Sequence, residues 1–328
     1  MGSKIRIVST AEMDRLDISM TEVMDAVETG FTALGKGVGE MPAKIGVHPR
    51  GDSFIHAMPC YLGGHIDRAG VKCISGYPTN PATGLPYISG VMILNDPETG
   101  LPQAIMDAAR ITAWRTGAAS GVYARHFGNP VTSRVTIVGT GVQGRANLLA
   151  MKEVFPELDE IRCCGVRALS IQRFIDEMAP EIPDAVFSLH TDLETAARDT
   201  DVLITCTPMI NEPTRPVRRQ WLKDDCLVIA VDYDACVGED VFKDAHFTCD
   251  HRDQYIRTQE TGIYFQNGYP LPGDIDADLC EVCAGDKRGL RKGRRGAVLM
   301  GIAAHDVMTA ALVYERAAEA GAGSQVEL

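Results

Sequence analysis

The feature that most constrains this fold is a glycine-rich segment near the middle of the chain. A β-branched run at 135–138 leads directly into Gly139, Gly141 and Gly144, within the sequence RVTIVGTGVQGR, and the helix-forming stretch ANLLAMKEVF follows at once. A strand, a Gly-x-Gly-x-x-Gly loop and a helix in this order predict a dinucleotide site. Gly139 would make the tight turn, Gly141 would let the backbone approach a pyrophosphate, and Gly144 would let the helix pack closely. The N–H groups and the positive end of that helix would hold the phosphates.

After Pro130 the sequence alternates short apolar runs with helical stretches. Strands are expected in VTIVGT, EIRCCGV, VFSLH, DVLITCTP, CLVIAVD and AHFTCD, with helices at 144–155 and 168–179 among them. This alternation predicts parallel strands with crossover helices on both faces of one sheet. We therefore predict an α/β fold with a Rossmann-type doubly wound parallel sheet over 130–302. A last helix is expected from about 298 to 320.

The first part of the chain has a different pattern. Residues 10–36 predict capped helices, with Thr10 and then Ser19 or Thr21 at the caps. From 43 to 94, short strand-like runs separated by Gly and Pro predict a mostly antiparallel sheet, and the Ala-rich segment 105–127 predicts a long helix.

The length of the chain predicts two domains. At 328 residues it is about twice as long as a typical domain. We expect an α+β domain at 1–129, completed by the C-terminal helix at about 303–328, and a dinucleotide-binding domain at 130–302.

Composition excludes several classes of function. The formal net charge of −12 argues against binding to nucleic acid or to an anionic membrane surface. No apolar run approaches the length of about 20 residues that a membrane span needs, and the N-terminal segment has no signal-peptide core. We expect a soluble, cytoplasmic protein without a metal ion. Its ten cysteines are too few for a disulfide scaffold, and five in apolar strand-like runs are expected to be buried free thiols: Cys73, Cys163, Cys164, Cys206 and Cys226.

The second strand of the predicted dinucleotide domain bears on the choice of cofactor. In such folds an acid about 20 residues after the glycine loop accepts hydrogen bonds from the adenosine ribose, and its charge repels a 2′-phosphate. Here Gly165 occupies that position and Arg167 follows two residues later. Arg167 could pair with the 2′-phosphate, which slightly favours NADP(H) over NAD; the alternative is a solvated arginine at the sheet edge.

Three cations in the first domain are candidates for binding an anionic substrate. Lys72 lies within an apolar strand, where a lysine is uncommon without an anionic partner, and Lys44 and Arg115 lie in the segments EMPAKIG and ITAWRTGAAS. A carboxylate would suit them, because arginine offers a bidentate fork and lysine a point charge. For each residue alone, an ordinary salt bridge within the protein is an equally good interpretation.

A candidate proton carrier lies in the second domain. The strand CLVIAV ends in Asp232, Tyr233 and Asp234, at the edge where parallel sheets bind their ligands. A carboxylate there could move a proton on or off a substrate nitrogen beside a nicotinamide, although a helix-capping or turn role is the alternative.

Together these segments resemble the ornithine cyclodeaminase and μ-crystallin family. The similarity covers nearly the whole chain, and the lysine strand and the R-T-[AG]-A helix segment distinguish this family from Rossmann proteins in general. It is carried by AMPCY, GVKCISGYPTNPATGLP, VMILNDPETGLPQAIMD, ITAWRTGAAS, TIVGTGVQG, DVLITCTP, IAVDYD and ALVYERAAEAGAG.

The resemblance implies roles for individual residues. Lys72 and Arg115 match residues that hold the substrate carboxylate, and Lys72 also matches a participant in proton transfer. Lys44 stands where many members have arginine, Met58 matches a methionine of the substrate pocket, and Asp234 matches the acid that cyclodeaminases use on the substrate amine. The cofactor-binding positions implied are Gly139, Gly141, Val142, Gln143 and Gly144 of the loop, with Thr116 and Thr205 in segments that border the cofactor. Family members pair through their first domains, so a homodimer is expected.

The reaction implied is hydride transfer between the α-carbon of an amino acid and a nicotinamide, through an imine. We expect three basic side chains from the front half of the chain to face a nicotinamide held by the back half. Net redox, as in an amino-acid dehydrogenase or a ketimine or imine reductase, is our first interpretation. The alternatives are ornithine cyclodeamination to proline with recycled NAD, and a non-catalytic, crystallin-like nucleotide-binding protein. His56, where an acid would suit a diamino substrate, weighs against the cyclodeaminase.

Overall fold

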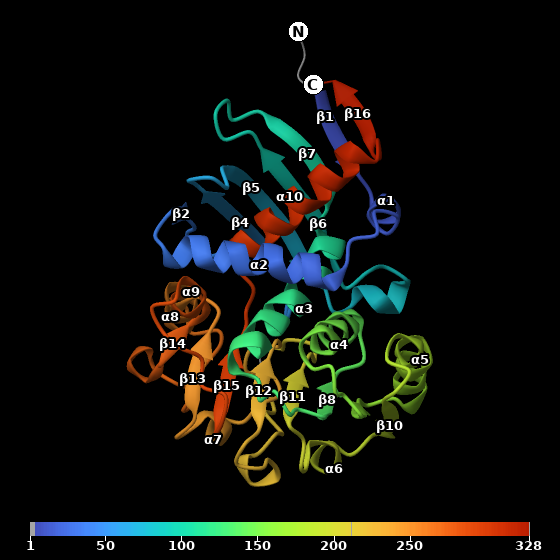
Figure 1. The fold of residues 1–328 in the computed structure, drawn as a ribbon, viewed down its shortest axis with the longest axis vertical. Helices are drawn as coiled ribbons and strands as arrows, with labels where there is room; N and C mark the ends of the chain where they lie inside the picture. The colour runs from blue at the N-terminus through green and yellow to red at the C-terminus, as the bar shows by residue number, and fades with distance from the viewer. Residues whose placement is uncertain (1–3, 211, 328) are drawn as a thin grey trace. The chain divides into compact units, whose positions relative to one another are not determined.

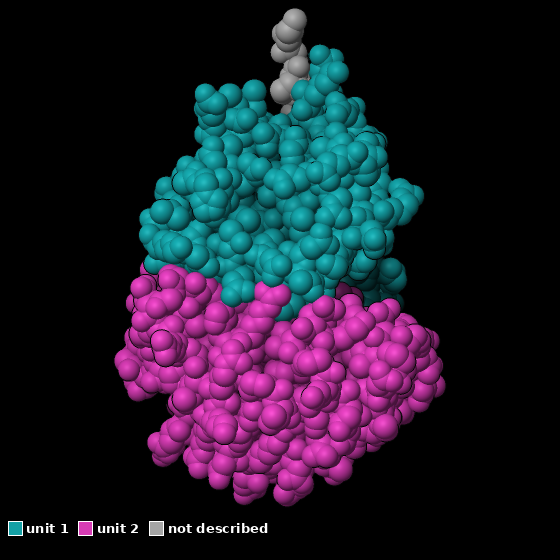
Figure 2. Space-filling model, viewed as in Figure 1, with its two compact units in different colours: residues 1–115, 301–328 teal, residues 116–300 magenta. Residues whose placement is uncertain are grey.

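The computed structural model describes residues 4–210 and 212–327. Two compact units divide the chain, one made of residues 1–115 with 301–328 and the other of residues 116–300 (Figures 1 and 2). The division passes through helix α3 (Ala108–Phe127), whereas the sequence analysis placed the domain boundary at its end. Among the described residues, no helix is both long enough and apolar enough to cross a membrane.

Unit 1 is built on an eight-stranded mixed sheet. Its order is β16-β1-β7-β6-β5-β4-β2, with β3 paired to β4. The strands β4 to β6 are antiparallel neighbours, as predicted. Strand β7, which was not predicted, is antiparallel to β6 and parallel to β1. The strands are β1 (Lys4–Val8), β2 (Gly39–Glu40), β3 (Ile45–Val47), β4 (Phe54–Leu62), β5 (Arg68–Gly76), β6 (Ile88–Asn95), β7 (Pro102–Asp107) and β16 (Ser324–Glu327).

The long helix predicted over 105–127 begins later than expected. Residues 105–107 complete strand β7, and α3 starts at Ala108. The Asp107 carboxylate explains the change, because it accepts the backbone N–H of Ala109 at 2.6 Å and of Arg110 at 3.2 Å, as a helix cap does. The prediction assigned the end of the strand to the helix, because the hydrophobic pattern does not change between them.

Helices cover one face of this sheet. Helix α2 (Met20–Gly35) and helix α10 (Ala303–Glu319) pack together (Figure 1). Helix α10 lies on β4, β5 and β6, and α2 contacts β2 and β4. Ser19 caps α2, whereas α1 (Thr10–Met13) is a single turn, and a 3₁₀ turn follows β5 at Asn80–Thr83. Because side chains alternate along β5, Lys72 is buried and Cys73 is exposed on the opposite face. The prediction of a buried thiol at Cys73 is therefore wrong.

Unit 2 is built on an eight-stranded sheet whose neighbouring strands are all parallel. The order is β10-β9-β8-β11-β12-β15-β13-β14, so strand order reverses between β8 and β11, the place where doubly wound folds bind ligands. The strands are β8 (Arg134–Val138), β9 (Glu160–Cys164), β10 (Val186–His190), β11 (Val202–Thr205), β12 (Leu227–Ala230), β13 (His246–Cys249), β14 (Ala277–Asp278) and β15 (Arg295–Val298).

The helices of unit 2 that follow α3 are α4 (Val142–Val154), α5 (Ala168–Met178), α6 (Leu193–Ala197), α7 (Glu239–Phe242), α8 (Arg252–Glu260) and α9 (Leu279–Ala284), with 3₁₀ turns at Ala179–Glu181, Arg219–Trp221 and Pro272–Asp274. The first three of these helices follow the predicted alternation, whereas α7, α8 and α9 were not predicted. The last helix begins at Ala303 rather than near 298, because residues 295–298 form strand β15 in the middle of the sheet. A buried strand of four residues is too short to show an alternating hydrophobic pattern, so it cannot be distinguished by pattern from the start of a helix.

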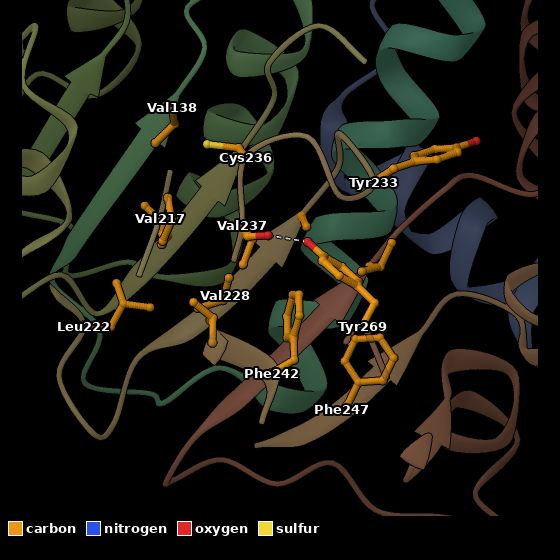
Figure 3. Close-up of a cluster of buried hydrophobic side chains, with 14 of the residues drawn as sticks. Val138, Val217, Leu222, Val228, Tyr233, Cys236, Val237, Phe242, Phe247 and Tyr269 are labelled. Carbon is orange, nitrogen blue, oxygen red and sulfur yellow. Dashed lines mark hydrogen bonds between the residues drawn. The ribbon is translucent and has the colours of Figure 1, made fainter. Parts of the chain in front are cut away.

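A buried aromatic and aliphatic cluster fixes the loop that follows β12 (Figure 3). Phe242, Phe247 and Tyr269 pack edge to face, and the Tyr269 hydroxyl donates a hydrogen bond to the Val237 carbonyl. This bond ties the segment after Asp234 to the core. Cys164 and Cys226 belong to the same cluster and Cys163 is also buried, as predicted for these thiols, while Cys206 is partly exposed.

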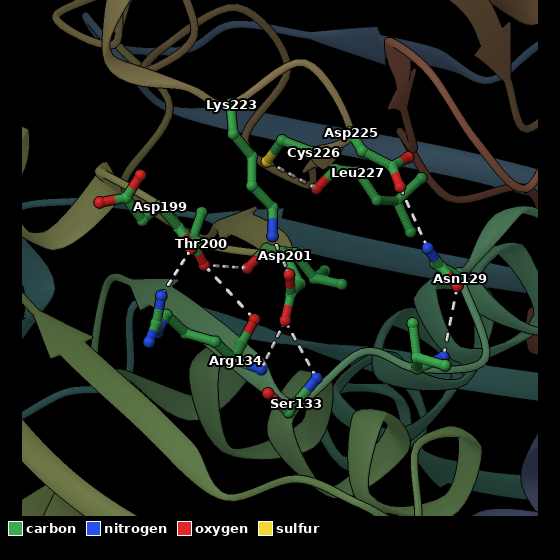
Figure 4. A network of polar contacts seen from close by, with 12 residues as sticks. Asn129, Ser133, Arg134, Asp199, Thr200, Asp201, Lys223, Asp225, Cys226 and Leu227 are labelled. Atoms are coloured by element: carbon green, nitrogen blue, oxygen red, sulfur yellow. Dashed lines mark hydrogen bonds and ion pairs between the residues drawn. The ribbon is translucent and has the colours of Figure 1, made fainter.

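A polar network holds the amino ends of the parallel strands (Figure 4). The Asp201 carboxylate accepts the backbone N–H groups of Ser133 at 3.0 Å and Arg134 at 2.8 Å and forms an ion pair with Lys223. These contacts tie together the starts of β8 and β11 and the turn before β12. The opposite, carboxyl edge carries the glycine loop.

Candidate active site

The glycine loop has the geometry that its sequence predicts. Gly139 has a φ of +101°, and a Cβ there would lie 2.5 Å from the Cys206 carbonyl oxygen. A Cβ on Gly144 would overlap the Gly139 carbonyl, whereas a Cβ on Gly141 would meet no atom within 4 Å. Two glycines are therefore required by the protein itself, and Gly141 keeps open space beside the loop. This is the space that a pyrophosphate needs in order to approach the backbone.

The N-terminus of α4 faces the same loop. The helix begins at Val142, whose side chain is 64% exposed, and the first N–H groups of a helix have no acceptor within it. Arg145 stabilises the turn by donating to the carbonyls of Thr140 at 2.8 Å and Gly141 at 3.0 Å. The Gln143 carbonyl accepts the side-chain amide of Asn147 at 2.8 Å. The loop thus fits a dinucleotide phosphate, with Val142 and Gln143 in the first turn.

The adenosine end of the predicted site has no acid at the usual position. Strand β9 ends at Cys164, and the Gly165 N–H donates to the His190 carbonyl at 3.2 Å. Arg167 is the exposed N-cap residue of α5. A cation therefore follows the strand where NAD-specific folds place a carboxylate.

Thr205 and Asp232 form a buried pair at the carboxyl edge. The Thr205 hydroxyl donates to Asp232 at 2.6 Å, and the Thr207 N–H donates to the other carboxylate oxygen at 2.9 Å. Burial raises the pKa of Asp232 above its usual value. The Thr205 hydroxyl is thus engaged with Asp232, and its contribution to the site is to fix the loop at 205–207.

Asp234 lies in a different environment from Asp232. Its Oδ2 atom forms an ion pair with Arg215 and accepts the Phe265 N–H at 3.1 Å. Tyr233, which precedes it, has a φ of +60°, a left-handed conformation that turns the chain sharply there. Sequence reasoning missed Arg215, since it lies in a proline-rich loop without periodicity.

Unit 1 contains a buried cluster of three charged side chains. Lys72 Nζ lies 2.7 Å from Asp306 Oδ1, and Arg115 Nε lies 2.9 Å from the same oxygen. The side chains of Lys72 and Asp306 are completely buried, and that of Arg115 is 6% exposed. Lys72 and Arg115, two of the three predicted carboxylate-binding cations, therefore share an ion-pair partner within the protein. One carboxylate shared by two cations still leaves the cluster with an excess of positive charge.

Burial changes the proton affinity of this lysine. It lowers the pKa of Lys72 to about 7, assisted by the positive charge of Arg115, while Asp306 acts in the opposite direction. Lys44 lowers it slightly further. A lysine with a pKa near 7 can hold or release a proton under neutral conditions, which is the property of a general acid or base.

The strands beside Lys72 supply an apolar wall. Met58 of β4 and Met92 of β6 are the cross-strand neighbours of Lys72, and both are buried. Cys60 lies on the same face as Met58, and burial raises the pKa of its thiol to about 12, so it is neutral. The Met58 position is thus adjacent to Lys72 in the sheet.

His56 completes the polar surroundings of this strand. Burial, with the charges of Lys44, His48 and Lys72, lowers the pKa of His56 to about 3. The imidazole is therefore neutral at pH 7, and its ring stacks on Phe54 with centroids 4.4 Å apart. This segment offers no anionic group to a cationic ligand.

Predicted residues thus lie in two groups, one in each unit. Lys44, Met58, Lys72 and Arg115 belong to unit 1, while the glycine loop, Arg167, Thr205 and Asp234 belong to unit 2. Thr116 is also in unit 2, buried in α3, where its carbonyl accepts the Ser120 hydroxyl at 3.5 Å. Sequence reasoning missed Asp306, although a carboxylate in the first turn of an otherwise apolar helix start, GIAAHDV, is the signal that could have found it.

Comparison with known proteins decides the family. A model of the ornithine cyclodeaminase/mu-crystallin family matches residues 5–321. This chain belongs to that family. It is 32% identical over 328 residues to an alanine dehydrogenase from Archaeoglobus fulgidus, with 98% of each protein covered.

Solved structures agree with this assignment. A Delta(1)-pyrroline-2-carboxylate reductase from Thermococcus litoralis, in complex with NADH and L-proline, is 29% identical, with a TM-score of 0.88 over 98% of this chain and 100% of that one. An archaeal alanine dehydrogenase dimer with bound NAD is 31% identical, with a TM-score of 0.86 over 99% and 100% of the two chains. The predicted family, α/β Rossmann-type fold and oxidoreductase class are confirmed, and these neighbours support an NAD-type cofactor.

The open space at Gly141 generates a test. We expect Gly141→Ala to leave the free energy of unfolding within about 0.5 kcal/mol, since its Cβ meets no protein atom. The same methyl group would stand where the pyrophosphate approaches, so the Kd for NADH or NADPH should rise at least about 10-fold. Gly139→Ala is the matched variant, and its positive φ and backbone overlap should instead lower stability by about 1–3 kcal/mol. Denaturant titration and fluorescence titration measure both; unchanged nucleotide binding in Gly141→Ala would contradict the site.

Proposed function

We propose that this protein is an NAD(P)(H)-dependent oxidoreductase that acts at the α-carbon of an L-amino acid or on its imine, as an amino-acid dehydrogenase or a ketimine or imine reductase. The observation that carries the proposal is the buried cationic cluster of Lys72 and Arg115, which retains excess positive charge after pairing with Asp306. A substrate carboxylate is the simplest ligand to neutralise it. The alanine dehydrogenase and pyrroline-carboxylate reductase relatives support this substrate class.

The cofactor would bind to unit 2. The loop residues Gly139, Gly141 and Gly144, with Val142 and Gln143 at the start of α4, would hold the pyrophosphate, while Thr116 and the loop fixed by Thr205 would border the rest of the molecule. When bound, the nicotinamide supplies a site that gives or takes a hydride at the substrate α-carbon. The protein's contribution is to fix this group and to keep water from it.

Lys72 is the better-supported proton carrier of the two candidates. Its pKa near 7 suits proton exchange with a substrate nitrogen or oxygen, and Arg115 and Lys44 would hold the carboxylate beside it. Asp234 is already engaged by Arg215 and by a backbone N–H, so it would first have to exchange the arginine for a substrate amine. We therefore assign the main proton step to Lys72 and a secondary one to Asp234.

The surroundings of His56 favour net redox over ornithine cyclodeamination. A diamino substrate needs an anionic group for its distal ammonium, whereas Lys44, His48 and Lys72 make this segment electropositive. Asp234 is the feature that supports the cyclodeaminase, and its ion pair with Arg215 weakens that support. Retained charged residues also argue against a crystallin-like protein that only binds a nucleotide.

A homodimer formed through the uncovered face of the unit 1 sheet is also proposed. Helices α2 and α10 lie on the other face, while the strand register places Ile45, Ala57, Cys73 and Val91 in one row on the face that they leave open. Ile45 is 69% exposed and Val91 is 44% exposed. An exposed apolar row of this kind is typical of an interaction surface, and a dimeric alanine dehydrogenase is among the structural neighbours.

The reaction class is tested by following absorbance and ammonia together. We expect NADH or NADPH to be consumed stoichiometrically with a 2-oxo acid plus an amine, or with a cyclic imine. Release of ammonia from ornithine with catalytic NAD, and without net formation of NADH, would establish cyclodeamination instead. If neither assay shows turnover, the proposal that the protein is an enzyme of this class would be refuted. Arg115→Met should raise KM and lower kcat, reducing kcat/KM about 100-fold for the loss of a charged hydrogen bond. The control is Arg68→Met, which removes a surface arginine paired with Glu315.

Cofactor preference is tested at Arg167. If this exposed arginine binds the 2′-phosphate, Arg167→Glu should raise the KM for NADPH at least about 10-fold by charge repulsion and leave the KM for NADH nearly unchanged. Arg173→Glu, in the following helix α5, is the control for the change in net charge. Equal effects on NADPH and NADH would show that Arg167 does not discriminate between them.

The dimer surface is tested at Val91. Val91→Lys places a charge in the centre of the apolar row and should convert a dimer into a species of 35.5 kDa, measured by light scattering. Val166→Lys, at a position that is 95% exposed in unit 2, should remain dimeric. A monomeric wild-type protein, or a Val91→Lys dimer of unchanged stability, would refute this surface.

A further inference from the structure

We propose that Asp306 is a positioning residue for the reaction, which holds the Lys72 ammonium and the Arg115 guanidinium on one carboxylate and keeps Lys72 in its protonated, substrate-binding form. This inference rests on the proposed function, and it concerns a residue that contributes no atom to the chemistry itself. Its evidence is the geometry of the buried cluster and the way in which the chain is built around it.

Both cations contact the same oxygen atom. Lys72 Nζ and Arg115 Nε both contact Asp306 Oδ1, at 2.7 and 2.9 Å. The three residues come from strand β5, helix α3 and helix α10, so no single element fixes their spacing. With one shared oxygen, a movement of Asp306 would move both carboxylate-binding groups.

The chain leaves room for this arrangement just before α10. Gly301, just before α10, has a φ of +77°, and a Cβ at this position would overlap the guanidinium of Arg115. The turn into α10 therefore brings Asp306 to Arg115 and makes space for its side chain. Asp306 also lies in the first turn of α10, where the positive end of the helix favours a carboxylate.

Asp306 uses only one of its two carboxylate oxygens in contacts with the described residues. Its Oδ2 atom is buried and has no hydrogen-bond partner among the described residues. A carboxylate kept only to stabilise the fold would be expected to use both oxygens. We therefore infer that the role of Asp306 is to place a negative charge, through Oδ1, in contact with Lys72 and Arg115.

Charged and titratable groups from several elements surround Lys72. Arg115 of α3, Lys44 before β3, and neutral His56 and Cys60 of β4 face the cluster, and Asp306 of α10 is the acid that contacts Lys72. Burial and the two cations favour loss of the Lys72 proton, and Asp306 opposes them. Without Asp306, the ammonium would lose its proton at a lower pH.

The test compares pH profiles of kcat/KM for the wild-type protein, Asp306→Asn and Glu315→Gln. Activity should fall on the alkaline side of the profile as Lys72 loses its proton, and we assign this alkaline limb to Lys72. In Asp306→Asn the limb should move to lower pH by about one unit or more, since an opposite charge in contact shifts a pKa by about 1–3 units. Glu315→Gln removes a charge from an exposed position of the same helix, and its limb should stay in place. A uniform loss of activity at every pH, with the limb unmoved, would overturn the inference and indicate a purely structural role.

Two further measurements keep the test decisive. If Asp306→Asn does not fold, Asp306→Glu carries the test, because it retains the charge but moves the oxygen. The KM for the substrate should rise at least about 10-fold, while the pH at which Lys72 titrates stays near its wild-type value. A wild-type KM would overturn the proposal. The ¹⁵Nζ shift of Lys72, in lysine-labelled protein and assigned with Lys72→Met, gives its titration without any activity. If the wild-type protein turns over neither an amino acid nor an imine, the proposed function is refuted. A difference in Nζ titration between that wild-type protein and Asp306→Asn would still support the role of Asp306 in keeping Lys72 charged.

Discussion

The candidate site depends on the cost of burying charge. Taking an ammonium out of water costs several kcal/mol, and a buried pair recovers this only with close contacts. Lys72 is completely buried, and the shared Oδ1 of Asp306 is the contact that makes its position tolerable. Because two cations share one carboxylate, neutralisation is incomplete. In the proposed function, the remaining positive charge would bind the substrate carboxylate. Burial, assisted by the charge of Arg115, brings the pKa of Lys72 to about 7.

In unit 2, the two edges of the sheet differ in how their loop N–H groups are used. At the amino edge of its sheet, Asp201 and its partners satisfy the loop N–H groups. At the carboxyl edge, Gly139 and Gly144 let β8 and α4 pack closely while Gly141 stays clear of other atoms. The Thr205–Asp232 bond and the cluster around Tyr269 then fix the neighbouring loops. Rigid surroundings of this kind would preorganise the proposed phosphate site through backbone N–H groups.

Local signals in the sequence were sufficient for much of the fold. The alternation after Pro130, the capped helix at Ser19 and the antiparallel run from 43 to 94 each depend on contacts between near neighbours along the chain. The errors occurred where two elements meet: the start of α3 at Ala108 and strand β15 before α10. The exposed Cys73 was misjudged because an apolar strand does not show which of its faces the helices will cover.

The sequence by itself determined the dinucleotide loop, the family and the identity of the cations Lys72 and Arg115, because these depend on fixed spacing and on residue type. Only the tertiary structure decided their partners. Asp306 lies 234 residues beyond Lys72 and meets it only when α10 packs on β5, and Arg215 meets Asp234 through a loop without periodicity. Such pairs form between residues that are far apart in the sequence and meet only when the chain folds, so no local sequence pattern predicts them.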